Sequence, residues 1–256
     1  MMNPRLILVV GLSVALIFAY FTASAQPRPG DPSRFDNVGE QHIEGLEFIA
    51  DNLDSISENP VFSAAGIQRL TIEFLCYDKP NSKCESSASR GALDGILSVE
   101  MTDDEFLADP AFTNRQAFYL ARLFEVFDAI GLGQPNFDLA VLKINTIEEE
   151  ALGERMNQRE RAAILVATSV ARSSAVYWAS VANDPTNRWL GGPGSGNDPV
   201  PAGRINWGDV GKSDLKGAIG GFFGGLFGGG LAGGLAGAAG GAIGASAVEV
   251  VDQLLD

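Results

Sequence analysis

Histidine, cysteine and basic residues are scarce in this 256-residue chain. A single histidine, His42, leaves little material for histidine-based catalysis or for a metal site with several histidines. Only 18 lysines and arginines stand against 32 acidic residues, which gives a net charge of -14. Because phosphate binding needs a basic surface, this composition argues against nucleic acid as a partner. We predict no catalytic residues, no metal site and no cofactor.

The first 25 residues have the pattern of an export signal. Arg5 is the only charged residue before an apolar run from Leu6 to Phe21, and Ala23-Ser24-Ala25 offers the small residues of a cleavage site. An uncleaved N-terminal anchor is the alternative, since the run is only slightly short for a spanning helix. Prolines then predict an extended segment over 26–37. We expect export to the periplasm, the cell surface or the medium, with membrane association left open.

The two cysteines fit an oxidising compartment. Cys76 and Cys84 enclose the segment CYDKPNSKC, whose Pro80-Asn81-Ser82 centre is typical of a turn. Such a turn brings the two sulfurs together, so we predict a Cys76–Cys84 disulfide. Two free thiols are the alternative.

Helical periodicity runs through residues 38–182, where apolar residues recur at steps of three and four. We predict an all-α bundle of five or six helices forming one domain. The predicted buried faces are His42, Leu46, Ile49, Leu53 and Ile56; Ile67, Leu70, Phe74 and Tyr77; Ala117, Leu120, Phe124 and Phe127; Leu139, Leu142 and Ile147; and Ile164, Thr168, Ala171, Ala175 and Trp178.

Capping residues set the expected helix starts. Thr102 and Glu105 form a capping box pattern, and a longer helix is expected to start near Phe112. Asn136 is expected to cap the next helix, and the last helix of the bundle is expected over about 158–181. A weaker helix is expected over about 85–97.

Residues 183–213 are rich in glycine and proline, which predicts a linker. Trp189 and Trp207 bracket its centre and are expected to pack onto the bundle, with a membrane-interface position as the alternative. Ser213 or Asp214 is expected to cap the helix that follows.

The stretch from Gly217 to Gly244 consists of seven tetrapeptides that each begin with glycine, and none of its side chains is charged or polar. This pattern is typical of a glycine zipper, in which helix backbones approach closely. Because glycine costs about 0.5–1 kcal/mol in a helix relative to alanine, such a helix needs a partner surface. The predicted packing residues are Gly217, Gly221, Gly225, Gly229, Gly233, Gly237 and Gly241.

A four-residue repeat drifts by about 40° per step around a helix with 3.6 residues per turn. One straight partner therefore cannot follow the glycine stripe along its whole length. A break at Gly228-Gly229-Gly230 resolves this, so we predict a hinge there within a hairpin of two arms, over about 214–228 and 231–254. The segment 214–256 is thus expected to form a zipper hairpin with an amphipathic tail.

Phosphate-binding patterns are incomplete. Gly208-Asp209-Val210-Gly211-Lys212-Ser213 ends like a phosphate-binding loop, but Asn206 stands where that motif needs glycine. We therefore expect no nucleotide. The acidic residues Glu40, Glu44 and Glu47 near His42 are expected to form a solvated helix face rather than a metal site.

The repeat GAIGGFFGGLFGGGLAGGLAGAAGGAIG resembles the glycine-zipper segments of bacterial envelope proteins and of small secreted bacteriocins of the double-glycine-leader class. That resemblance implies membrane insertion, helix association and, for bacteriocins, pore formation. The segments DNVGEQHIEGLEFI and SSAVYW, followed by the zipper, resemble an uncharacterised family of exported bacterial proteins, which supports the domain layout alone.

Two hypotheses follow. In the first, which we prefer, the chain is an exported non-catalytic binding or structural protein whose zipper packs against itself, a second copy or an envelope protein. In the second, residues 214–248 insert into a membrane as an anchor or a bacteriocin-like pore.

Overall fold

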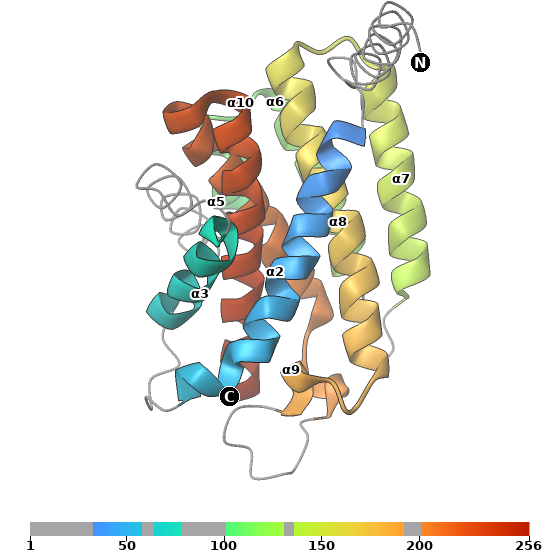
Figure 1. Cartoon of the computed structure of the whole chain (residues 1–256). Helices are drawn as coiled ribbons and strands as arrows, with labels where there is room; N and C mark the ends of the chain where they lie inside the picture. Colours follow the sequence, from blue (N-terminus) through green and yellow to red (C-terminus); the bar gives the residue numbers. More distant parts are fainter. Residues whose placement is uncertain (1–32, 58–63, 78–100, 131–135, 192–200, 256) are drawn as a thin grey trace, which may run out of the picture.

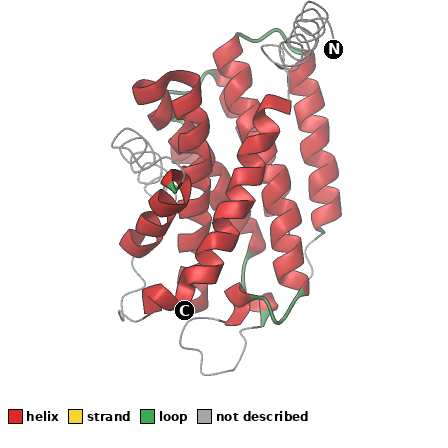
Figure 2. Ribbon diagram, in the orientation of Figure 1, coloured by secondary structure: helices red, strands yellow, loops and turns green. Residues whose placement is uncertain are grey.

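Eight α-helices and one 3₁₀ helix make up the part of the chain that the structure, a computed structural model, describes (Figures 1 and 2). The described residues are 33–57, 64–77, 101–130, 136–191 and 201–255, and they contain no strand. The predicted all-α class is therefore confirmed. The helices are α2 Ser33–Ser57, α3 Ala64–Cys76, α5 Asp103–Leu107, α6 Asn114–Asp128, α7 Phe137–Gly153, α8 Gln158–Asn183, α9 Arg188–Gly191, η1 Ala202–Arg204 and α10 Trp207–Leu255.

Several predictions concern residues outside these ranges. They are the export signal over 1–25, the helix over about 85–97 and the cysteine Cys84. The extended segment predicted over 26–37 lies only partly outside, and its last residues are helical because α2 begins at Ser33.

Capping residues fix the helix starts as local chemistry requires. Thr102 accepts a hydrogen bond from the Glu105 amide, and the Glu105 carboxylate accepts one from the Thr102 amide. Thr113 and Gln116 form a second such box, so α6 begins at Asn114 and not at Phe112. The predicted cap of α7 at Asn136 is present.

Most of the predicted faces are buried, but α7 is rotated relative to the prediction. Leu139 and Leu142 are exposed, at 44% and 64%, because Ala140 and Ile144 lie on the side of α7 that packs against the bundle. Tyr77, expected on the buried face of α3, is 78% exposed and lies just beyond the end of that helix. Ile56 belongs to residues whose side chains are not described.

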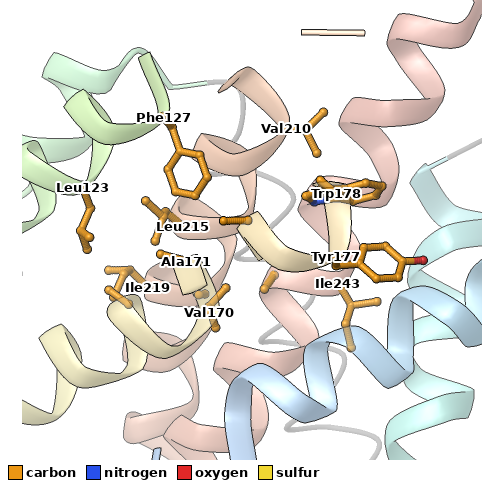
Figure 3. Packing of buried hydrophobic residues seen from close by; sticks show 14 of the residues in the cluster. Leu123, Phe127, Val170, Ala171, Tyr177, Trp178, Val210, Leu215, Ile219 and Ile243 are labelled. Atoms are coloured by element: carbon orange, nitrogen blue, oxygen red, sulfur yellow. The ribbon is translucent and has the colours of Figure 1, made fainter. Parts of the chain in front are cut away.

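The glycine-rich α10 lies inside the bundle. It contacts α2, α3, α6 and α8, and its apolar side chains belong to the same core as theirs. Figure 3 shows Leu215 and Ile219 of α10 beside Leu123 and Phe127 of α6, with Ile243 farther away beside α2. The bundle and the hairpin, predicted as successive segments, thus share a single core.

The helix α10 begins at Trp207, which corrects the predicted cap at Ser213 or Asp214. Asn206 accepts a hydrogen bond from the Gly208 amide at 3.1 Å and so caps the helix earlier. The predicted linker over 183–213 is also interrupted by α9 and η1.

Three tryptophans pack together near the start of α10. Trp189 and Trp207 are buried, and their rings lie 5.7 Å and 5.6 Å from that of Trp178 in α8. The Trp189 indole donates a hydrogen bond to the Tyr177 hydroxyl at 2.8 Å. Both bracketing tryptophans therefore pack onto the bundle.

Candidate functional site

The two arms of α10 are in direct backbone contact through glycine. A Cβ atom built on Gly241 would overlap the carbonyl oxygen of Gly217, and one built on Gly217 would overlap that of Gly241. Any side chain here would force the arms apart, because real Cβ atoms do not approach a carbonyl so closely. The facing pairs are Gly217 with Gly241, Gly221 with Gly237, and Gly225 with Gly233. The glycine face of each arm is therefore occupied by the other arm of the same chain.

The break between the arms lies at Gly230. Its backbone has φ 60° and ψ -152°, a region that essentially only glycine adopts. A Cβ at this position would meet nothing within 4 Å, so backbone conformation and not space requires glycine here. Gly228 and Gly229, predicted as part of the hinge, precede the break within the bounds of α10.

The outer sides of the hairpin face the bundle. A Cβ at Gly45 of α2 would overlap the side chain of Ile243, so α2 lies close to the second arm. Ile219 and Phe222 of the first arm are fully buried. Figure 1 shows the second arm, in red, running down to the C-terminus beside α2.

The first arm is tied to the bundle by a buried carboxylate at Asp214. This carboxylate accepts hydrogen bonds from His42 Nε2 at 2.9 Å, from Trp178 Nε1 at 2.9 Å and from the Ser174 hydroxyl. The Asp214 and His42 side chains have no exposed surface. A buried carboxylate costs several kcal/mol of desolvation unless donors surround it, and three donors do so here. Asp214 therefore joins α10 to α2 and α8.

His42 uses only one of its ring nitrogens in this network. Its Nδ1 atom is buried and has no hydrogen-bond partner among the described residues. Because the ring has no exposed surface, a substrate in solution cannot reach it. The arrangement also places the carboxylate, rather than the histidine, at the centre of the group, unlike a nucleophile–histidine–carboxylate relay. We interpret it as an anchor.

The sequence prediction did not identify this anchor. The sequence alone predicts Asp214 as a helix cap and His42 as part of a buried helix face. Two features of the sequence hint at such an anchor. They are a lone histidine within an apolar helix face and an aspartate three residues before a segment without polar side chains. Neither signal identified the other residue as its partner, because 172 positions separate them.

Lysines near the base of the first arm are paired with acidic residues of neighbouring elements. The Lys212 ammonium lies 2.7 Å from the Asp128 carboxylate and 3.3 Å from that of Asp103, and Lys216 lies 2.8 Å from Asp103. Burial opposes the charged form of Lys212, but hydrogen bonds and the charges of Asp128 and Asp103 outweigh it and raise the pKa of this ammonium. These pairs fix α10 against α5 and α6.

The remaining candidate groups do not form a ligand site in the described part of the chain. Glu40, Glu44 and Glu47 are exposed on α2, whereas His42 points into the core, and the described residues include no cluster of three metal-ligating side chains. The segment 208–213 is helical, and Gly211 packs against the ring of Phe127, so it does not form a phosphate-binding loop.

The outer surface carries an open hollow of about 260 Å³ between α6 and α7. Arg122 and Lys143 supply positive charge to its wall, while Glu125 supplies negative charge. Arg122 is also paired with Glu150. The mixed charge of this hollow does not select one class of ligand.

Cys76 is buried at the end of α3. The disulfide with Cys84 stays a prediction.

No family model, curated protein or solved structure matches this chain.

Proposed function

We propose that this protein is an exported, non-catalytic binding or structural module that acts as a single chain, with the glycine hairpin as its internal frame. The observation that carries this proposal is the contact between Gly217 and Gly241, because the close partner that a glycine zipper needs is the other arm of the same helix. Self-association through the zipper face is then unnecessary, and contacts with a partner fall to the outer surface of the bundle.

The burial of the Asp214–His42 pair supports a non-catalytic role. Asp214 and His42 are enclosed and mutually satisfied, and the lysines beside them are neutralised by Asp103 and Asp128. The acidic composition favours a soluble exported module over one that binds nucleic acid or anionic lipid. Export itself rests on the signal pattern over 1–25, and sequencing the N-terminus of the exported protein tests it, with Gln26 as the expected first residue.

Mass measurement in solution tests the single-chain proposal. We expect light scattering coupled to gel filtration to give the monomer mass across a hundredfold range of protein concentration. The variant Gly241→Leu is expected to lose stability and to stay a monomer, since it disrupts contacts within one chain. A concentration-dependent dimer that Gly241→Leu converts to monomer would show that the zipper face joins two chains, and the proposal would be wrong.

A chain truncated at Asp214 is unsuitable for this purpose. It would lose Ile219, Phe222 and Ile243, which belong to the shared core. Point substitutions keep that core and change only the contact under test.

A further inference from the structure

Burial of the glycine hairpin decreases toward its tip. The side chains there with described surroundings are apolar, with Ala232 exposed and Leu226, Leu231 and Leu235 half-buried. Gly230, where the arms meet, is also exposed. Apolar surface gathered at one end of an otherwise enclosed element is a candidate for contact with another apolar phase.

The charges of the hairpin all lie at the opposite end. No residue from Gly217 to Ala245 has a charged or polar side chain. At the base, the Ser213 hydroxyl donates a hydrogen bond to the Glu249 carboxylate at 3.2 Å, which places the two arms in register there. The hairpin is therefore a rod with charge at one end and none at the other.

This distribution distinguishes the hairpin from an ordinary core helix. Two described segments, Gln158–Asn183 and Gly230–Leu254, are apolar and long enough to cross a membrane by length and composition. The first carries Arg172 near its middle, whereas the charged residues of the second, Glu249 and Asp252, lie near its end at the base of the hairpin. The second packs on its partner arm through backbone contacts, and its backbone hydrogen bonds are internal to the helix, which is what a hydrocarbon phase requires.

We propose that the hairpin tip is a docking surface for a lipid bilayer, with Leu226, Leu231 and Leu235 entering first. The thirteen steps from Gly217 to Gly230 give an arm of about 20 Å, which is shorter than the hydrocarbon thickness of about 30 Å. The hairpin therefore enters from one side without crossing and does not form a pore.

The charges near the first arm fit a zwitterionic lipid surface. The exposed Arg159 at the start of α8 lies 5.8 Å from the ring of Phe223, seven positions before Gly230, so a guanidinium flanks the first arm below the tip. The net charge of -14 disfavours anionic headgroups. Phosphatidylcholine is accordingly the lipid for the test.

Flotation with phosphatidylcholine vesicles loaded with a self-quenched dye tests the proposal. The purified exported protein is expected to float with the vesicles without releasing the dye. Leu231→Asp should lower the floating fraction about tenfold or more, because a carboxylate is costly in hydrocarbon. Leu142→Asp is the matched control on the exposed side of α7 and should float like the original protein. All variants share one N-terminus, so differences between them report the hairpin.

Circular dichroism and elution volume confirm that each variant is folded before flotation. Leu231→Trp gives a second measurement that does not add a charge. The native tryptophans are already buried, so a blue shift of its emission on adding vesicles, relative to the unsubstituted protein, reports entry of the tip. The proposal is overturned by absence of flotation, by equal flotation of folded Leu231→Asp, by equal loss in Leu142→Asp, by dye release, or by unshifted emission.

Discussion

Gly217 and Gly241 lie on opposite arms of α10 with no room for a side chain on either residue, because a Cβ on each would overlap the carbonyl oxygen of the other. The two touching residues are 24 positions apart in the chain, and their contact sets the separation of the arms. It explains why this helix tolerates so much glycine.

Gly241→Ala is expected to lower the free energy of unfolding by about 1–3 kcal/mol, the usual cost of overpacking. This change goes against the intrinsic preference of about 1 kcal/mol for alanine over glycine in a helix. The matched control is Gly153→Ala in the last turn of α7, where an added Cβ meets nothing within 4 Å. Urea unfolding should show unchanged or slightly raised stability for the control, and equal effects at the two positions would contradict the close contact.

Gly230→Ala is expected to destabilise the protein by about 1–3 kcal/mol, although the space around Gly230 is open. The reason is the backbone conformation, with φ 60° and ψ -152°, which alanine adopts only with strain. Thermal unfolding monitored by circular dichroism measures the loss. A neutral substitution would show that the break between the arms is formed differently.

Asp214→Ala is expected to cost about 3 kcal/mol or more, because it leaves the buried donors of His42, Ser174 and Trp178 without an acceptor. Ser174→Ala should cost less, about 1 kcal/mol, since two donors to the carboxylate remain. Urea unfolding of both variants tests this order. Similar losses from the two changes would mean that the carboxylate is not the centre of the network.

Asp103 gives the protein a specific sensitivity to acid. Burial alone would raise the pKa of its carboxyl, but the hydrogen bond and charge of Lys216, helped by Lys212, hold that pKa below the usual 3.8. A depressed pKa contributes stability that is complete above about pH 4 and is lost as the pH falls through the folded-state value. The stability difference between the original protein and Asp103→Asn should therefore shrink below about pH 4.

Salt provides the control for this prediction. The Asp103 carboxylate is partly accessible, so 1 M salt should reduce the neutral-pH difference between the two proteins by screening. Denaturant titrations at several pH values, with and without salt, measure both effects. A difference that stays constant from pH 7 to pH 2 would contradict the assigned role of the lysine pair.

Local signals in the sequence were sufficient for much of the fold. The capping box at Thr102 and the cap at Asn136 act over three residues, so their partners are visible in the sequence. The helical class follows from apolar periodicity in the same way. The rotation of α7 was not visible, because Leu139 and Leu142 are as apolar as a core residue and only packing decides that Ala140 and Ile144 face inward.

The sequence by itself determined the glycine hairpin. A repeat of four against a turn of 3.6 residues forces a break, and the chain supplies three consecutive glycines where a break is sterically cheapest. Only the tertiary structure decided what the arms contact and where they are anchored. Their glycine faces contact each other, and their large side chains fill the bundle core. Asp214 accepts a hydrogen bond from His42, which lies 172 positions earlier in the chain. Such pairings depend on how whole helices pack, and the spacing of residues along one helix does not encode its neighbours.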